Sequence, residues 1–389
     1  MTLVLFADPA LRSSAGIERY SRELIRAAFA GEWAERTVLL TTARPALEEL
    51  LRGLGCAGAP VVETRLSARA LRYAWSFAGL PAADAVVRAR TARPVKLVHN
   101  PGNLRTPARG CPQVVTIHDM FMFKTPGLRT LRQRLVASRE MEERAVSHSA
   151  HMIVPSQSTK QDIVELFGTP GDRVTVVPHG VDHEWFRPRE DDGALARLRE
   201  RLGIPERYVL YVGSLYSRKV GRLLEGFERV ARELGPDECK LVLVGGREST
   251  AEGEVPIAER IRRLGLERSV VRTGELPAED IPVLMSGAAV FTYVSLYEGF
   301  GFSPLEAMAC GAPVIVSRAT SLPEVVGDAG ILVDPADVAA TGDAMLRVLG
   351  DPACRAELGR RSLARAREFS WSRTAREHFA VYTRMMESA

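Results

Sequence analysis

Two glutamates stand eight positions apart in the segment SLYEGFGFSPLEAMACGAPVI, residues 295–315. Glu298 and Glu306 lie on either side of a glycine-rich stretch that follows an apolar run and precedes a helical pattern. Gly299 and Gly301 allow a tight turn and let a ligand approach the backbone. The free N–H groups at the start of the next helix, with the positive end of its dipole, favour an anion. The segment therefore predicts an anion site, with phosphate as the natural guest.

Glu306 has two competing interpretations. Ser303 is a good helix N-cap and Pro304 suits the first helical position, so Ser303-x-x-Glu306 fits a capping box. In the alternative, Glu306 binds a ligand, and the residues alone do not decide between the two. Glu298 precedes the turn, so no capping geometry explains it. Its structural interpretation is an ordinary solvated carboxylate in a loop.

The elements that must position these residues form a repeating pattern. Apolar, β-branched runs alternate with helical stretches, and most runs are continuous, which is typical of parallel strands covered by helices on both faces. Two such series predict an α/β fold with two doubly wound, Rossmann-like domains. The expected strands are TLVLFAD, RTVLLTT, APVVETR, VKLVHN, QVVTIHD, HMIVPS, VTVVPH, RYVLYVGS, CKLVLVGG, VVRTGE, VFTYVS, PVIVS and GILVD.

The length of 389 residues exceeds the ~250–300 over which one core stays favourable, so two domains are expected. Turn residues and charges interrupt the pattern between Pro178 and Gly193. We predict an N-terminal Rossmann-like domain over residues 1–183 and a C-terminal Rossmann-like domain over 184–370. A last helix over 371–389 either closes the second domain or crosses back to the first. Ligands of open α/β sheets bind outside the carboxyl ends of the strands, so two facing sheets would form a cleft.

Composition excludes several classes of protein. Apolar content of 46% and charged content of 26% are those of a soluble globular chain. The run TLVLFAD is too short for a signal peptide, and no stretch reaches the ~18–20 apolar residues of a membrane span. The five cysteines are odd in number and lack metal-site spacing. Reduced thiols in a cytoplasmic protein are therefore expected.

Charge is unevenly distributed along the chain. Residues 1–180 carry 24 basic and 16 acidic side chains, whereas residues 181–389 carry 28 and 32. Scatter over solvated faces explains this, and so does contact of the first half with an anionic membrane or a phosphorylated acceptor. Nucleic acid is disfavoured, because the arginines are not interleaved with aromatic residues.

The glutamate segment resembles the E-x7-E signature of the retaining glycosyltransferases of family GT4, which have the two-domain GT-B fold. The resemblance covers nearly the whole chain and is weakest from about Arg44 to Val95. It implies transfer of a hexose from a GDP- or UDP-linked sugar to a hydroxyl acceptor, with retention at the anomeric carbon. A cell-envelope glycan or a lipid-linked sugar is one acceptor class, and a small natural product is the alternative. The other matching segments are AGIERYSRELIRA, VVTIHD, VPSQSTKQDIVELFG, VTVVPHGVD, YVGSLYSRKV, LVLVGG and SLPEVVGDAGILVDPAD.

The resemblance also implies roles for single residues. Lys219 falls at the position of the family's diphosphate-binding lysine, with Arg218 as a second cation. Glu298 would lie against the donor sugar, and Glu306 would accept hydrogen bonds from the ribose. His118 matches the histidine near the transferred sugar. The structural alternatives are a solvated helix start for the two cations and a buried histidine bonded to a backbone carbonyl for His118.

Further positions complete the donor site that the resemblance implies. A backbone N–H at Gly16, in the first βα loop, would approach the diphosphate, and Gly274 with Glu275 would pack the base. Ser214 stands where many members carry an arginine, and His179 where asparagine is common. The donor-binding candidates are Gly16, Ser214, Gly274, Glu275, Gly299, Phe300, Gly301, Phe302, Leu305 and Glu306.

No cofactor and no metal are expected. A DxD motif is absent from the sequence, since Asp191 and Asp192 are adjacent and lie in a probable linker. No covalent nucleophile stands out, and the resemblance implies a reaction on one face in which the leaving phosphate assists the incoming hydroxyl. A dehydrogenase or epimerase would need G-x-G-x-x-G after the first strand, which ADPALRSSAGIER lacks. A non-catalytic sugar-nucleotide-binding scaffold stays open as a second alternative.

A basic stretch in the first half, GLRTLRQRLVASREMEERAV over residues 127–146, has the pattern of an amphipathic helix. It is either a solvated face over a leucine stripe or a peripheral membrane contact for a lipid-linked acceptor. We therefore expect a cytoplasmic protein, with attachment at the inner face of the membrane left open.

Overall fold

The computed structural model of the chain describes residues 2–11, 15–125, 138–189, 193–246, 248–249 and 255–388. These residues divide into two compact units. Unit 1 contains residues 2–124, 138–180 and 371–388, and unit 2 contains Val181–Ser370. The boundaries fall after Gly180 and after Ser370, where the sequence predicts residues 183 and 370.

The sheet of unit 1 is parallel, with strand order β3-β2-β1-β4-β5-β6-β7. The chain winds outward from β1 to β3 and then returns to β4 beside β1. Neighbouring βα connections therefore lead in opposite directions between β1 and β4, which makes this pair the switch point where ligands of such sheets bind. The strands are β1 (Thr2–Phe6), β2 (Thr37–Thr41), β3 (Val61–Glu63), β4 (Val95–Asn100), β5 (Gln113–Thr116), β6 (His151–Val154) and β7 (Val174–Val176).

The main sheet of unit 2 is also parallel, with strand order β12-β10-β8-β13-β14-β15 and its switch point between β8 and β13. A short parallel pair, β9 with β11, lies outside it and is not predicted by the sequence. The strands are β8 (Arg207–Val212), β9 (Leu215–Tyr216), β10 (Cys239–Val244), β11 (Glu248–Ser249), β12 (Val270–Gly274), β13 (Val290–Tyr293), β14 (Val314–Ser317) and β15 (Ile331–Val333).

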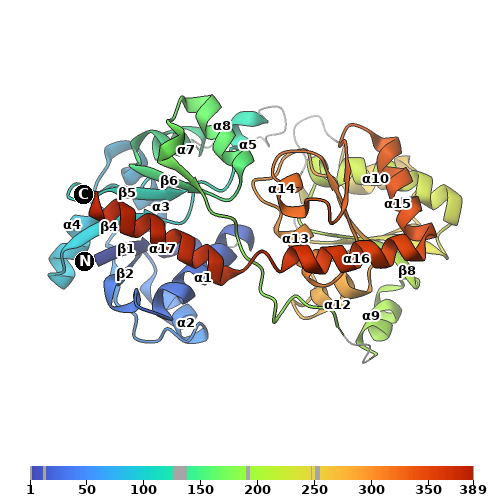
Figure 1. Cartoon of the computed structure of the whole chain (residues 1–389), viewed down its shortest axis with the longest axis horizontal. Coiled ribbons are helices and arrows are strands. Elements are labelled where there is room, and N and C mark those ends of the chain that lie inside the picture. The colour runs from blue at the N-terminus through green and yellow to red at the C-terminus, as the bar shows by residue number, and fades with distance from the viewer. Residues whose placement is uncertain are drawn as a thin grey trace. The chain divides into compact units, whose positions relative to one another are not determined.

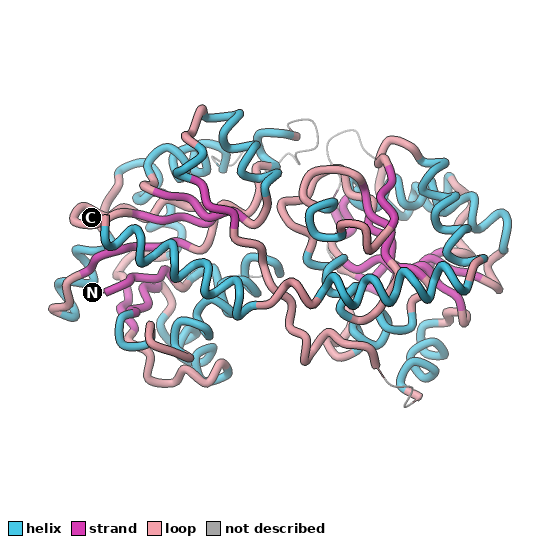
Figure 2. The backbone as a smooth tube through the Cα atoms, viewed as in Figure 1, coloured by secondary structure: helices cyan, strands magenta, loops and turns pink. Residues whose placement is uncertain are grey.

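Helices surround the strands within each unit, as the ribbon and the coloured tube show (Figure 1, Figure 2). The main helices of unit 1 are α1 (Ala15–Phe29), α2 (Arg44–Gly53), α3 (Ala68–Tyr73), α4 (Ala83–Thr91), α5 (Phe121–Lys124), α7 (Ser138–His148), α8 (Gln157–Phe167) and α17 (Trp371–Glu387). Those of unit 2 are α9 (Ala194–Leu202), α10 (Ser217–Leu234), α11 (Ile257–Arg263), α12 (Asp280–Gly287), α13 (Phe302–Ala309), α14 (Leu322–Val326), α15 (Val338–Gly350) and α16 (Pro352–Ala366).

The predicted α/β fold is confirmed. Each apolar run named above forms a strand. Strands β1, β2, β6, β13 and β14 are buried along their whole length, as expected where helices cover both faces. The last helix, α17, belongs to unit 1. Its Val381 and Tyr382 pack into a core with Leu3 and Leu97 from the strands of that sheet, and α17 runs beside α1 (Figure 1).

Candidate functional site

Lys219 and Glu298 follow the two strands that form the switch point of unit 2. The chain leaves β8 and enters α10, which carries Lys219 in its first turn. The chain leaves β13 and reaches Glu298 in the loop before α13. Because β8 and β13 are neighbours, both loops emerge at the same edge of the sheet. Two residues 79 positions apart in the sequence thus meet in space.

The two side chains form an ion pair. Lys219 Nζ lies 2.7 Å from Glu298 Oε1, and the side chains are only 12% and 15% exposed. Lys219 also donates to the hydroxyl of Tyr293 at 2.9 Å. Glu298 Oε1 accepts from the hydroxyl of Ser295 at 2.7 Å and from that of Tyr293 at 3.3 Å. At this depth the attraction is screened far less than in a surface pair, so the arrangement is held firmly.

The backbone of Glu298 is fixed from the loop after β14. Its N–H donates to Thr320 Oγ1 at 3.0 Å, and its carbonyl accepts from Ser321 Oγ at 2.9 Å. Thr320 has φ = +50°, a left-handed conformation that is unusual for a β-branched residue. Such strain persists where surrounding contacts impose it, and it concentrates at functional sites. We find that it brings the Thr320 hydroxyl to the Glu298 amide.

The start of α13 differs from the sequence expectation. Gly301 is the N-cap, with φ = +121°, and no side chain caps the helix. The predicted capping box at Ser303 is therefore wrong, because the helix begins at Phe302, before Ser303 and Pro304. A side chain at position 301 would also meet Leu322 Cδ2 at 2.7 Å, so glycine is needed for both conformation and space. Glu306 lies in the second turn and is buried, 5% exposed.

The other candidate residues of this segment are two glycines, which offer only backbone, and three apolar side chains that pack in or against the core of unit 2. Gly299 and Phe300 precede α13, and Phe302 is its first residue; the two phenylalanine ring centroids are 5.4 Å apart. Phe300 and Leu305 are buried in the core of unit 2, and the Leu305 N–H bonds to the Gly301 carbonyl. The Phe300 carbonyl accepts from Ser321 Oγ at 2.7 Å. Of these five residues, the glycines present the least side-chain bulk to a ligand.

The remaining unit 2 candidates lie at the same edge of the sheet. Ser214 follows β8, and its carbonyl accepts from Tyr211 Oη at 2.8 Å. Gly274 ends β12, and its carbonyl accepts from the Gly245 N–H at 2.9 Å. A Cβ at Gly246 would lie 2.6 Å from Glu275 Cγ, so Glu275 packs directly on that backbone. These contacts form a surface with little side-chain bulk beside an exposed carboxylate.

In unit 1, His118 follows β5 and is buried. The ring atom Nε2 of His118 lies 2.8 Å from the Pro101 carbonyl oxygen. The backbone N–H of His118 donates to Asn103 Oδ1. Nε2 therefore carries the proton, and Nδ1 is the acceptor atom. Burial lowers the pKa of His118 to about 4, so its ring is neutral at neutral pH. This geometry matches the structural alternative described above and also leaves a neutral, oriented imidazole.

His118 lies beside a buried network of rings. Tyr20 Oη bonds to Thr116 Oγ1 and to His378 Nε2, each at 2.7 Å. His99 bonds to Thr116 at 2.9 Å and to Tyr382 Oη at 2.7 Å. The network ties α1 and α17 to the ends of β4 and β5. Burial lowers the pKa of the histidines in it and raises that of Tyr20.

Gly16 lies in the first turn of α1 rather than in the loop before it. First-turn N–H groups lack intrahelical acceptors, so the position still suits an anion. The Arg218 side chain, Asp191 and Asp192, and most of the predicted 127–146 helix lie outside the described residues. From residue 138 onward that segment is α7.

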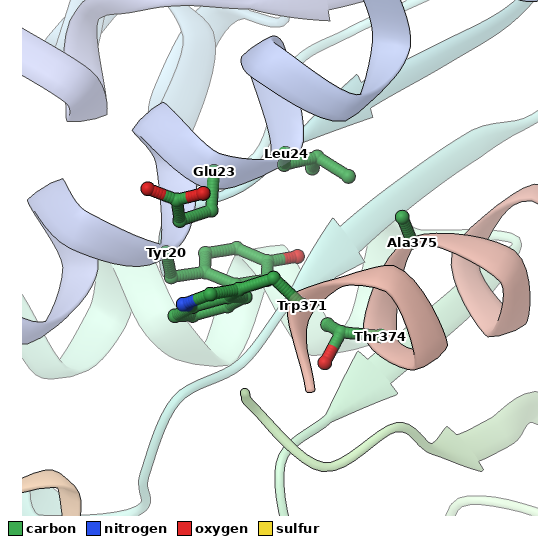
Figure 3. Close-up of a pocket in the computed structure, with 6 residues that line it drawn as sticks. All are labelled: Tyr20, Glu23, Leu24, Trp371, Thr374 and Ala375. Carbon is green, nitrogen blue, oxygen red and sulfur yellow. The ribbon is translucent and has the colours of Figure 1, made fainter. Parts of the chain in front are cut away.

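A hollow between α1 and α17 is lined by Tyr20, Glu23, Leu24, Trp371, Thr374 and Ala375 (Figure 3). Its volume of about 170 Å³ includes open solvent. Ligand pockets usually measure ~300–1,000 Å³, so this hollow is too small for a nucleotide sugar.

Two negative findings apply to the part of the chain that the structure describes. We find no helix there that is long and apolar enough to cross a membrane. We also find no group of three His, Cys, Asp or Glu side chains in those residues that could hold a metal ion.

Comparison with known proteins identifies the family. The family described as "Glycosyltransferase Family 4" matches residues 14–185, and "Glycosyl transferases group 1" matches residues 206–351. The O-antigen chain mannosyltransferase B of Escherichia coli is 30% identical, over 98% of this chain and 99% of that protein. The chain belongs to the group 1 glycosyltransferases.

Further relatives of this glycosyltransferase have other named activities. The D-inositol 3-phosphate glycosyltransferase of Acidothermus cellulolyticus is 33% identical over 72% of this chain and 64% of that protein. Among solved structures, Anabaena HepE in complex with UDP and glucose superposes with a TM-score of 0.70 at 19% identity, over 98% and 100% of the two chains. Sucrose-phosphate synthase from Thermosynechococcus elongatus gives 0.73 at 22% identity over both whole chains. These structures agree with the GT-B fold.

The structure adds residues to this candidate site that sequence reasoning missed. Tyr293 ends β13, Ser295 follows it, and both bond to the ion pair, while Thr320 and Ser321 hold the Glu298 backbone. A signal existed for each: the first two are polar residues at or just after the end of an apolar strand, and the others stand at or just before the start of the SLPE segment. Sequence position alone does not show that these loops converge.

Proposed function

We propose that this glycosyltransferase transfers a hexose from a GDP- or UDP-linked sugar to a hydroxyl acceptor, with retention at the anomeric carbon and without a metal. The observation that carries the proposal is the Lys219–Glu298 ion pair, 2.7 Å between Nζ and Oε1, at the switch point beside the start of α13. Cations and oriented N–H groups at one place are what a departing diphosphate requires.

The chemical step breaks the bond between the anomeric carbon and the β-phosphate oxygen. The electron pair leaves with the nucleoside diphosphate, so negative charge grows on that oxygen. Lys219 can meet this charge because an ammonium has three donors, and Glu298 and Tyr293 are the acceptors that it has among the described residues. The first N–H groups of α13 supply further donors.

The acceptor oxygen then forms its bond to the anomeric carbon on the face that the phosphate leaves. Its proton passes to the leaving phosphate oxygen, so no protein nucleophile or base is needed. Glu298 would accept hydrogen bonds from donor-sugar hydroxyls while it holds Lys219 in place. Glu306 would accept hydrogen bonds from the ribose hydroxyls.

Residues of both units supply the remaining proposed contacts. The neutral imidazole of His118 would accept a hydrogen bond through Nδ1 near the transferred sugar without adding charge there. The N–H of Gly16 would reach the diphosphate from the first turn of α1. Gly274 and Glu275 in unit 2 would pack the base.

The names of relatives favour a hexose. The full-length E. coli relative is a mannosyltransferase, and HepE has been crystallised with UDP-glucose. We therefore propose a hydroxyl of a cell-envelope glycan or of a lipid-linked sugar as the acceptor. The protein would act in the cytoplasm, at the inner face of the membrane where such an acceptor is anchored.

The test is release of nucleoside diphosphate from a panel of GDP- and UDP-hexoses, with and without sugar acceptors, in excess EDTA. We expect turnover with one donor, and nuclear magnetic resonance of the product should show the anomeric configuration of the donor. An inverted product, or activity that appears only after magnesium or manganese is restored, would contradict the proposal.

A further inference from the structure

Four of the five large apolar side chains that are exposed among the described residues of unit 1 gather on one segment. Leu66, Tyr73, Phe77 and Leu80 are 38–45% exposed, and they lie on or next to α3 and the π-helical turn η3 (Ala74–Ala78). Large apolar side chains scattered singly over a surface need no explanation, but a group of them does.

Tyr73 and Phe77 form the centre of this exposed segment. They are four positions apart and their rings stack with centroids 6.2 Å apart, while Leu66 precedes α3 and Leu80 follows η3. The opposite side carries Leu71 and Trp75, which are buried in the core of unit 1. A helix that is apolar on both sides is normally buried on both, whereas the four outer side chains stay more than one-third exposed although α7 packs against η3.

Positive charge surrounds this outer face. Residues 64–83 contain arginines at 65, 69 and 72 and no carboxylate. Arg144 of α7 lies over the Phe77 ring, with Cζ 5.0 Å from its centroid. Arg105 lies against Gly79, where a Cβ would be 3.3 Å from Nη2. Burial lowers the pKa of Arg105, and repulsion from the charge of Arg144 lowers it further.

Acidic neighbours do not cancel this charge. Arg65, Arg69, Arg105 and Arg144 make no ion pair with any residue that the structure describes. Glu140 and Glu143 of α7 are exposed and form no ion pair with these arginines among the described residues. The carboxyl of Glu142 interacts with Arg72, which is therefore not counted among the four. A second copy of this chain would bring an equally basic face, so charge complementarity requires an anionic partner.

We propose that the α3–η3 surface, formed by Leu66, Tyr73, Phe77 and Leu80 with Arg65, Arg69, Arg105 and Arg144, rests on an anionic lipid bilayer. Tyrosine, phenylalanine and leucine enter the boundary between headgroups and acyl chains, and the arginines meet the lipid phosphates. The inference deepens the proposed function and rests on it in one respect, which is that the bilayer would present the lipid-linked acceptor. It differs from the sequence expectation, which assigned membrane contact to residues 127–146.

Co-sedimentation of the full chain with vesicles tests this surface. The vesicles are phosphatidylcholine alone or with about one-third phosphatidylglycerol, at low and high salt. The variants are Tyr73→Ser/Phe77→Ser/Leu80→Ser and Arg65→Gln/Arg69→Gln. The matched controls are Leu166→Ser, an equally exposed leucine on α8, and Arg52→Gln, an exposed arginine on α2.

We expect binding to the anionic vesicles that weakens with salt, and roughly tenfold weaker partitioning for each variant set. The controls should bind like the parent chain. Binding equal on neutral vesicles, no binding, or unchanged binding of both variants overturns the proposal. Self-association that the serine variant abolishes, without vesicle binding, also overturns it by assigning the surface to a second copy. The arginine variant changes only exposed positions, so it keeps the test valid if the triple variant does not fold.

Parallel assays separate this inference from the proposed function. Release of nucleoside diphosphate from the soluble donor does not need a vesicle. If the chain does not bind vesicles but still releases nucleoside diphosphate, only the proposed membrane surface is overturned. If the chain binds vesicles but neither releases nucleoside diphosphate nor transfers a sugar, the proposed function is overturned and the membrane surface still stands.

Discussion

The Nζ atom of Lys219 lies 2.7 Å from Oε1 of Glu298, and the Tyr293 hydroxyl lies between the two side chains at 2.9 and 3.3 Å. The ring of Tyr293 stacks on Tyr211 of β8, with centroids 5.2 Å apart. The pair is therefore positioned by the two central strands of unit 2. A rigid base of this kind keeps the lysine in place before any ligand arrives, which lowers the cost of meeting charge in the transition state.

Substituting Glu298→Gln should separate binding from catalysis. The change removes the negative charge that competes for Lys219, so nucleoside diphosphate should bind as tightly or more tightly. Sugar transfer should fall by roughly 100-fold or more, since the acceptor for sugar hydroxyls and the anchor of Lys219 are both weakened. Calorimetry and initial rates measure the two effects. Glu206→Gln, an exposed carboxylate elsewhere in unit 2, is the control, and an equal loss of activity there would refute a specific role.

Glu306 should recognise ribose hydroxyls. We expect a 2′- or 3′-deoxy nucleoside diphosphate to bind the parent chain roughly tenfold more weakly than the ribonucleotide, as a lost hydrogen bond to a charged group does. That difference should shrink in Glu306→Gln. If both chains discriminate equally, another residue reads the ribose.

The absence of a capping box at α13 predicts a small effect at Ser303. Loss of a true N-cap costs about 1 kcal/mol, whereas Ser303→Ala should change the free energy of unfolding by less than about half of that. Urea unfolding of the parent, Ser303→Ala and Ser156→Ala measures this. Ser156 is the matched control, because it caps α8 by accepting from the Thr159 N–H. If Ser303→Ala and Ser156→Ala lower the free energy of unfolding equally, Ser303 caps α13 and this interpretation of the helix start is wrong.

The buried histidines of unit 1 should make the fold acid-sensitive. The pKa of His118 and of His378 falls from 6.5 to about 4 on burial, so the folded state disfavours the proton and the unfolded chain takes it up first. Stability is therefore present above about pH 6.5 and lost as pH falls toward 4, by up to roughly 1.4 kcal/mol per pH unit for each histidine.

Urea midpoints across this range measure the loss. His378→Gln keeps a hydrogen-bonding group next to Tyr20 but cannot titrate, so its slope with pH should be smaller than that of the parent chain. Replacement of exposed His148 by Gln is the control and should leave the slope unchanged. A His378→Gln slope equal to that of the parent would show that the network does not cause acid sensitivity.

Much of the fold follows from local pattern, and the site follows only in part. Continuous apolar runs predict the strands because helices bury both faces of a parallel sheet. Strand order depends on long-range packing, so the sequence alone does not show that Lys219 and Glu298 meet. The sequence leaves open whether Ser303 caps α13, and the structure decides against it: Ser303 has the better capping side chain, but Gly301 adopts φ = +121° and the helix begins at Phe302. Thr320 was missed because propensity argues against a left-handed β-branched residue.

Thermal unfolding in EDTA, with a panel of nucleoside diphosphates, is the most direct measurement of the claim that Lys219 and Glu298 form a donor site. A ligand at 100 times its dissociation constant adds about 2.7 kcal/mol of stability. We predict a shift for UDP or GDP that is lost in Lys219→Met and kept in Lys240→Met, whose ammonium bonds only to the Gly203 carbonyl among the described residues. A shift that survives in Lys219→Met, or none with any member of the panel, would contradict the account.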